Sequence, residues 1–210
     1  MAFLLAHRGR VWLLGMACAL VLGLGVVSRF DSHPDEGLHV LSAAYYHNHW
    51  LPPAVSDPEL PRFLNPTWGA NYITSSPPEI TYLLGAKFAR LFGGPGGGSW
   101  RPFRTYAWVL WLVLVLSVAL RPRLDPVYAL FLMLTPQVWY VFGYFNGDAF
   151  PFFVAFLIAL ELGRADSLAQ RYFAAPAPCS SWRQALPMGV LCGLLVLSRI
   201  HYAVVSLYVA

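Results

Sequence analysis

Residues 11–39 read VWLLGMACALVLGLGVVSRFDSHPDEGLH. The first part, residues 11–27, carries no charged side chain, and an α-helix needs about 20 mostly apolar residues to cross a bilayer. The second part, residues 31–39, brings three acids and two histidines directly after it. Ionisable groups at the edge of the hydrocarbon are costly and usually serve a function. This stretch therefore predicts a membrane protein with a chemically active turn at the end of its first helix.

The composition of the whole chain agrees with that prediction. Its 210 residues are 58% hydrophobic and only 11% charged, against roughly 45–50% and 25% in soluble domains. This composition excludes a soluble enzyme, a coiled coil and a disordered chain. The formal net charge is +4, but the basic side chains lie beside apolar runs and form no stripe. We therefore expect no nucleic-acid partner.

Five segments are apolar enough to be candidate spans, namely residues 11–27, 106–120, 127–145, 149–162 and 186–210. We therefore predict an all-α, polytopic transmembrane bundle of about five spans. Residues 29–105 are too long for a simple connection and form a predicted external loop. Within it, residues 79–92 have a helical pattern, but at about 1.5 Å per residue they reach only about 21 Å. We interpret them as a helix lying at the membrane interface.

The arginines fix the predicted topology. With five spans, the short loops that carry arginine all lie on the side of the N-terminus, which the positive-inside rule makes cytoplasmic. These residues are Arg8, Arg10, Arg121, Arg123, Arg164, Arg171 and Arg183. Arg101 and Arg104 remain outside, in a long loop where the rule is weaker. The turns at residues 31–39 and 145–148 then share the external face, so we expect an integral protein of the plasma (inner) membrane with its active site outside.

The turn after the first span has two explanations. As helix-start chemistry, Pro34 fits the first helical turn, and Asp35 and Glu36 would face the positive end of the helix dipole. As a metal site, Glu36 and His39 lie one turn apart on one helix face. The second pattern falls short of His-Glu-x-x-His, so a zinc protease is not expected.

Two later sites carry the other candidate charges. Asp148 follows Asn146 and a glycine in a turn between apolar runs, and it is predicted to face the side that carries Asp35. A carboxylate pair across a cleft can hold a divalent cation or share acid and base roles. Arg199 and His201 interrupt the last apolar segment near its outer end. They either snorkel to the interface or bind an anion, because guanidinium matches phosphate by paired hydrogen bonds.

The order of these motifs resembles that of a known superfamily. A first helix ending in Pro-Asp-Glu-x-x-His, a Pro-Pro-x-x-x-Tyr-Leu-Leu helix in a long loop and a later acidic turn resemble the GT-C membrane glycosyltransferases. The protein O-mannosyltransferase-like and aminoarabinose-transferase-like members are the most similar in pattern. The resemblance covers roughly residues 10–205 and implies inverting transfer of a sugar. The donor would be a polyprenyl-phosphate-linked sugar, and the acceptor a lipid, glycan or protein of the cell envelope.

The resemblance also implies a role for each candidate residue. Asp35 matches the first acid of the family's loop motif, which is the general base, and Glu36 would support it or take the role itself. Asp148 matches a second acidic position that binds a metal in some members, so Mg or Mn is expected with Asp35 and Asp148 as ligands, although Asn146 replaces the preceding acid of that turn. The expected substrate-binding residues, with Arg199 on the donor phosphate, are His39, Glu79, Tyr82, Asn146, Arg199 and His201.

The same resemblance leaves an alternative open. Relatives commonly carry more spans and often a soluble external domain, so we expect residues 1–210 to form a single amino-terminal or truncated module. The alternative is a noncatalytic membrane scaffold or subunit that retains the fold, in which the acids only cap helices. The two hypotheses differ in what Asp35→Asn does: it abolishes transfer in the first and changes only stability in the second.

Overall fold

The computed structural model describes residues 2–54, 56–67, 69–75, 79–93, 99–121, 124–174 and 182–199. Within these ranges all regular structure is helical and no strand occurs. The prediction of an all-α fold is therefore confirmed for the described chain.

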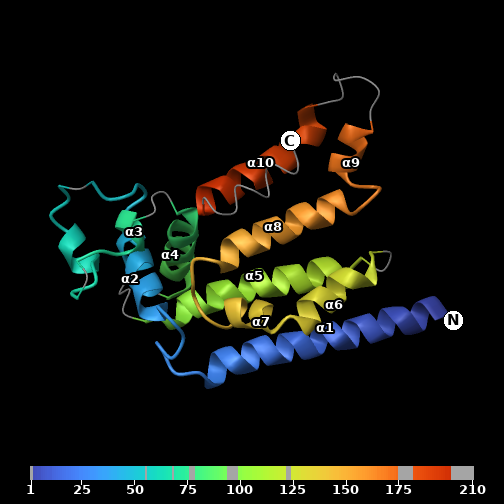
Figure 1. The fold of residues 1–210 in the computed structure, drawn as a ribbon, viewed down its shortest axis with the longest axis horizontal. Helices are drawn as coiled ribbons and strands as arrows, with labels where there is room; N and C mark the ends of the chain where they lie inside the picture. Colours follow the sequence, from blue (N-terminus) through green and yellow to red (C-terminus); the bar gives the residue numbers. More distant parts are fainter. Residues whose placement is uncertain are drawn as a thin grey trace.

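Six helices form a bundle, and the longer ones among them run along the long direction of the molecule (Figure 1). They are α1 (Ala2–Val27), α5 (Arg101–Ala119), α6 (Pro126–Leu134), α7 (Pro136–Gly143), α8 (Ala149–Leu162) and α10 (Trp182–Ser198). α5 packs on α1, α7 and α8, and α8 packs on α10. The remaining elements are α2 (Glu36–Tyr46), η1 (Leu60–Phe63), α3 (Tyr72–Ser75), α4 (Ile80–Gly93) and α9 (Leu168–Phe173). The first four of these cover one end of the bundle, and α9 lies at the other (Figure 1).

The prediction of five spans is wrong, because too few of the described helices have the length and apolar composition that a span requires. Among the described residues only Arg8–Val27 and Arg101–Ala119 are long and apolar enough to cross a membrane. α6 and α7 add a third if they count as one span, but they are bent by 61° relative to each other. The bend follows from Pro136, which cannot continue the hydrogen bonding of α6, and from extended backbone at the preceding Thr135.

The two last candidate spans fall short for a simpler reason. α8 has only 14 residues and the described part of α10 only 17, against the requirement of about 20. Residues 200–210 of the predicted fifth span lie outside the described residues. Apolar composition alone does not show where a helix ends.

The helix ends form two groups at opposite ends of the bundle. The Arg10 guanidinium donates to the carbonyl oxygens of Arg121 at 2.9 Å and Leu124 at 2.8 Å, which ties the start of α1 to the turn after α5. The loop that carries Arg164 lies at this same end, whereas α1 and α7 end at the opposite end, beside α2 and α4 (Figure 1). The arginine-bearing turns and the acidic turns therefore occupy opposite ends of the bundle.

Close packing seats α4 against the bundle. A Cβ atom at Gly85 would lie 2.6 Å from a ring carbon of Phe145, so the helix reaches this position only with a glycine there. Its face with Tyr82, Ala86 and Ala89 is buried. The predicted helix at residues 79–92 is thus confirmed, and its first turn is fixed next to the turn between α7 and α8.

Candidate functional site

In the turn between α1 and α2, one aspartate caps the following helix and the other does not. Asp31 and Asp35 both adopt positive φ, at 60° and 59°, a conformation that Asp tolerates better than most residues. The Asp31 Oδ1 atom accepts a hydrogen bond from the Gly37 amide at 2.8 Å, whereas Asp35 makes no side-chain capping bond. Asp31 therefore caps α2, and helix-start chemistry does not account for the side chain of Asp35.

Glu36, adjacent in sequence, has the opposite environment. It is fully buried, and both its oxygens accept bonds from the Arg104 guanidinium at 2.6 and 2.7 Å. Arg104 is only 1% exposed and also donates to the carbonyl oxygens of Gly25, Ser28 and Arg29. A carboxylate enclosed in this way cannot reach a substrate, so the predicted catalytic role of Glu36 is not supported. This pair also explains why an arginine of the external loop remains at this end.

Asp35 lies at the rim of a cavity. It is exposed, and its Oδ2 atom accepts a hydrogen bond of 3.1 Å from the Tyr72 hydroxyl. The cavity has a volume of about 610 Å³ and is lined by Asp31, Ser32, His33, Pro34, Asp35, Gly37, Leu38, Leu41 and Asn65. Asp148 and Arg199 are not among these lining residues. The cavity is large enough for a small ligand, and the exposed carboxylates of Asp31 and Asp35 both line it.

Aromatic rings connect Asp35 to the interior. The Tyr72 ring stacks on His39, with centroids 4.5 Å apart, and the His39 Nδ1 atom lies 2.7 Å from the Tyr82 hydroxyl. Burial, and secondarily the positive charge of Arg199, lowers the pKa of His39 to about 3. His39 is thus neutral at physiological pH. It holds the two tyrosines in place and does not itself donate a proton.

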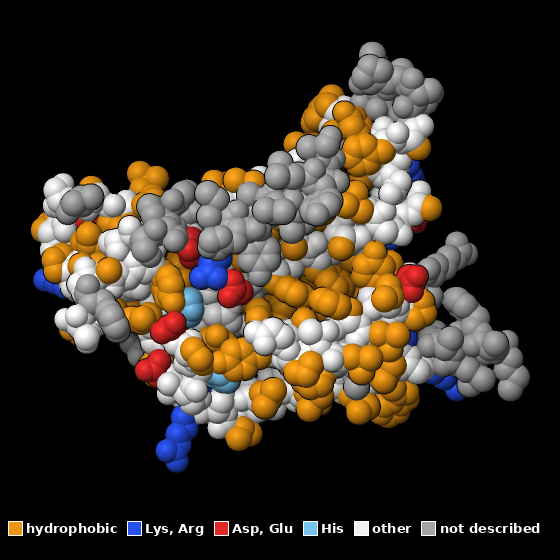
Figure 2. Space-filling model, in the orientation of Figure 1, with side chains coloured by type: hydrophobic (Ala, Val, Ile, Leu, Met, Phe, Trp, Pro, Cys, Tyr) orange, Lys and Arg blue, Asp and Glu red, His pale blue; other side chains and the backbone are white. Residues whose placement is uncertain are grey.

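Arg199 joins three helices through two carboxylates. It forms an ion pair with Asp148, and its Nε atom lies 3.7 Å from Oε1 of Glu79. Figure 2 shows acidic side chains gathered around a basic one near this end of the molecule. The Arg199 side chain is 22% exposed and that of Asp148 is 41% exposed, so an anion from solvent can approach the guanidinium. The structure therefore brings together Glu79, Tyr82, Asp148 and Arg199, which are distant in the chain.

Glu79 is the buried member of this cluster. Its side chain is 4% exposed, and its Oε2 atom is buried without a hydrogen-bond partner among the described residues. Burial raises the pKa of Glu79 to about 7, although the positive charge of Arg199 opposes the shift. The carboxyl group can therefore gain or lose a proton near neutral pH.

The structure does not show the other two predicted substrate-binding residues, Asn146 and His201, at this site. The Asn146 side chain donates to the Val141 carbonyl at 2.6 Å and accepts from the amides of Asp148 at 2.8 Å and Ala149 at 3.0 Å. These bonds hold the turn between α7 and α8, as the turn chemistry of Asn predicts, and leave no part of the amide for a substrate. His201 lies outside the described residues.

The predicted divalent metal site does not fit the donors. Within the described residues no group of three or more His, Cys, Asp or Glu side chains could hold a metal ion. Asp148 is engaged by Arg199, and Asp35 accepts from Tyr72. The expected pair of ligands, Asp35 and Asp148, is therefore not assembled, and we derive no chemistry from Mg or Mn.

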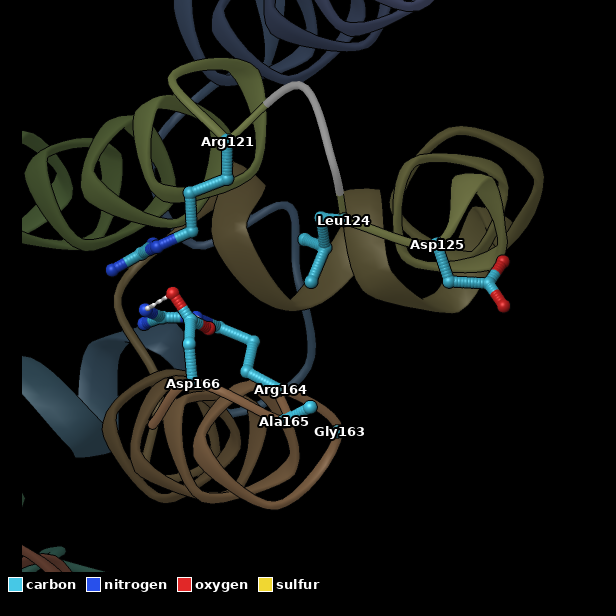
Figure 3. Close-up of a pocket in the computed structure, with 7 residues that line it drawn as sticks. All are labelled: Arg121, Leu124, Asp125, Gly163, Arg164, Ala165 and Asp166. Atoms are coloured by element: carbon cyan, nitrogen blue, oxygen red, sulfur yellow. Dashed lines mark hydrogen bonds and ion pairs between the residues drawn. The ribbon is translucent and has the colours of Figure 1, made fainter. Parts of the chain in front are cut away.

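A second cavity lies at the arginine-bearing end. Its volume is about 630 Å³, and it is lined by Arg121, Leu124, Asp125, Gly163, Arg164, Ala165 and Asp166. Arg121 points into it towards Arg164 and Asp166, whereas Asp125 points away (Figure 3). Arg164 is paired with Asp166 at 3.3 Å and Glu161 at 3.2 Å, so its charge is already balanced by two carboxylates.

Sequence reasoning missed two residues of the first site. Tyr72 orients Asp35, and Arg104 neutralises Glu36, yet neither belongs to a motif. The only signal for Arg104 was its position as a basic residue outside the membrane, against the positive-inside pattern. Nothing in the sequence distinguishes Tyr72 from the other tyrosines of the chain.

Comparison with known proteins adds no relative: no family model, curated protein or solved structure matches the chain. The resemblance to the GT-C glycosyltransferases therefore depends on the sequence motifs and is an argument for a proposal.

Proposed function

We propose that this protein is a membrane glycosyltransferase that moves a sugar from a polyprenyl-phosphate donor to an acceptor hydroxyl at the external face. One observation carries the proposal. Among the acids predicted at the site, Glu36, Glu79 and Asp148 each face an arginine. Asp35 is instead exposed at a cavity, and within the described part of the chain its side chain bonds only to a tyrosine hydroxyl. An uncommitted carboxylate in that position suits a general base.

The proposed reaction is a single displacement with inversion. Tyr72 holds Oδ2 of Asp35, and Oδ1 accepts the proton of the acceptor hydroxyl. The acceptor oxygen then forms a bond to the anomeric carbon, while the bond from that carbon to the phosphate oxygen breaks. The electron pair leaves with the phosphate, and the products are the glycosylated acceptor and polyprenyl phosphate. Positioning of donor and acceptor supplies much of the rate.

Arg199 is the proposed partner of the donor phosphate. Guanidinium binds phosphate oxygens by paired, charge-assisted hydrogen bonds, and Arg199 is a partly exposed cation next to Asp148 and Glu79. The phosphate would compete with Asp148 for the same nitrogen atoms. A polyprenyl chain needs an apolar environment, which is consistent with the two or three helices that can cross a membrane. On this proposal the protein is a polytopic protein of the plasma (inner) membrane with its N-terminus in the cytoplasm.

A noncatalytic scaffold or subunit is the second candidate. It is favoured by the ion pairs of Glu36 with Arg104 and of Asp148 with Arg199, because each joins helices that are distant in the chain. In that case Asp35→Asn changes no activity, and the cavity at Asp35 has no substrate.

The test is turnover by membranes that contain the full chain. Radiolabelled polyprenyl-phosphate mannose and, separately, the aminoarabinose donor are supplied, and the release of polyprenyl phosphate is measured. Asp35→Asn should lower the rate by about 10²- to 10⁴-fold, the usual contribution of a general base. The control is Asp31→Asn, which removes a charge from the same cavity while Asn keeps an oxygen for the Gly37 amide and tolerates positive φ. Equal rates in Asp35→Asn and the control would reject the assignment of the base, and no turnover by the unaltered chain would favour the scaffold.

A further inference from the structure

The charges around Arg199 do not balance. One guanidinium faces two carboxylates, an exposed one on Asp148 and a buried one on Glu79. If both carboxylates are ionised, the cluster of Arg199, Asp148 and Glu79 carries a net charge of −1. A negative charge disfavours binding of the donor phosphate that we propose for Arg199. A phosphate that approached Arg199 would then be the third anion beside a single cation.

The buried carboxylate is the one that costs most to keep ionised. The Asp148 side chain is 41% exposed and therefore open to solvent, whereas that of Glu79 is 4% exposed and its Oε2 atom has no hydrogen-bond partner among the described residues. An ionised oxygen that is neither hydrated nor hydrogen-bonded is strongly disfavoured. A third anion therefore favours protonation of Glu79.

We propose that binding of the donor phosphate at Arg199 is coupled to the uptake of a proton by Glu79. This inference rests on the proposed function, because it assumes a polyprenyl-phosphate sugar as the ligand. In the free protein Glu79 shares Arg199 with Asp148. In the complex the phosphate takes the place of a carboxylate, Glu79 becomes a neutral carboxylic acid, and the charge of the cluster is preserved.

The neighbours of Glu79 do not titrate in the same pH range. On α2, burial keeps the pKa of His39 near 3 and raises the pKa of Tyr46 to about 12. Burial also raises the pKa of Tyr72 on α3, and that of Tyr82 on α4 well above its ordinary value. The charged neighbours are Arg199 after α10 and Asp148 before α8. Among these described groups around Arg199, Glu79, with its pKa near 7, is therefore the one that responds to pH between 5.5 and 8.5.

Linkage gives the sign and size of the effect. Because the complex holds more protons than the free protein, the Kd of the donor should rise with pH. A rise of about one unit in the pKa of Glu79 on binding makes Kd about 8-fold higher at pH 8.5 than at pH 5.5. The donor is a phosphodiester with a fixed single negative charge, so it contributes no pH dependence of its own.

The experiment measures donor binding to a chain that cannot turn it over. The full chain with Asp35→Asn is purified in detergent, and the Kd of a short-chain polyprenyl-phosphate mannose is measured by titration calorimetry from pH 5.5 to 8.5. The same titration is repeated with Glu79→Gln added, since Gln keeps the shape of the side chain and cannot ionise. The matched control adds Glu59→Gln, because Glu59 faces His49 and not Arg199.

Each outcome decides the inference. A Kd that rises several-fold with pH, and becomes constant only with Glu79→Gln, supports it. A constant Kd in the Asp35→Asn chain, or a rise that persists with Glu79→Gln, overturns it while leaving the proposed function intact. Absence of donor binding at every pH rejects both. If Glu79→Gln does not fold, calorimetry of the Asp35→Asn chain in buffers of different ionisation enthalpy counts the protons taken up at pH 7. A value near one half supports coupling at Glu79, and zero overturns it.

Discussion

Removal of the Glu36 carboxylate should destabilise the protein strongly. Glu36→Ala leaves Arg104, which is 1% exposed, without the two bonds of 2.6 and 2.7 Å that balance its charge. Loss of one partner of a buried ion pair costs about 3–5 kcal/mol. For a chain of this size each kcal/mol lowers Tm by about 2–4 °C, so the expected fall in Tm is about 6–20 °C.

The backbone contacts of Arg104 predict an asymmetry between the two partners. In Glu36→Ala the guanidinium keeps three carbonyl acceptors, on Gly25, Ser28 and Arg29. In Arg104→Met those carbonyls lose their donor and the Glu36 carboxylate is buried unpaired. Arg104→Met should therefore be the more destabilising change. The double variant with Glu36→Leu should recover part of the loss, because no charge then remains buried.

The assay is thermal unfolding of the purified chain in detergent, followed by tryptophan fluorescence, together with donor turnover in membranes. The structural role assigned to Glu36 predicts a lower Tm for Glu36→Ala. If Tm changed by less than about 2 °C while turnover was abolished, Glu36 would be a catalytic residue and the reasoning above would be refuted.

Two further predictions concern packing and pH. Gly25→Ala should lower the free energy of unfolding by about 1–3 kcal/mol, because its Cβ would lie 2.6 Å from Nε1 of Trp108 and 2.7 Å from the Gly143 carbonyl oxygen. The matched control is Gly15→Ala, whose Cβ would have nothing within 4 Å. Equal Tm values for the two variants would contradict the close approach at Gly25. Because burial holds the pKa of His39 near 3 in the folded protein, below its ordinary 6.5, its contribution to stability is complete above pH 6.5 and falls as the pH drops. The free energy of unfolding should fall by about 2 kcal/mol from pH 7 to pH 5. Denaturant titrations at both pH values should show a smaller fall in His39→Gln than in the unaltered chain. An equal fall in the two chains would show that another group is responsible.

The prediction of five spans was wrong because the sequence did not show where the apolar helices end. Apolar composition correctly located residues 127–145 as helical, but Thr135 and Pro136 divide them into α6 and α7. The proline was visible in the sequence. Whether a proline merely kinks a helix or ends it depends on how its neighbours pack, and α1 and α5 contact both halves separately.

The fate of the two adjacent acids shows what sequence reasoning could not reach. Asp35 and Glu36 are equivalent in any motif, yet one is exposed at a cavity and the other is enclosed by an arginine 68 positions away. Similarly, Glu79 was predicted to bind substrate only from the resemblance to the GT-C glycosyltransferases. Its burial and its sharing of Arg199 come from the meeting of α4, α8 and α10.

The sequence by itself determined that the chain is helical, that its long apolar helices suit a membrane, and that the acidic turns gather away from the arginine-bearing loops. These features follow from local composition and from alternation of chain direction, which are properties of neighbouring residues. Only the tertiary structure decided which carboxylates are paired with an arginine and which one is exposed at a cavity. The physical reason is that the energy of a charge depends on burial and on the nearest opposite charge, and both are set by residues that folding brings together from distant parts of the chain.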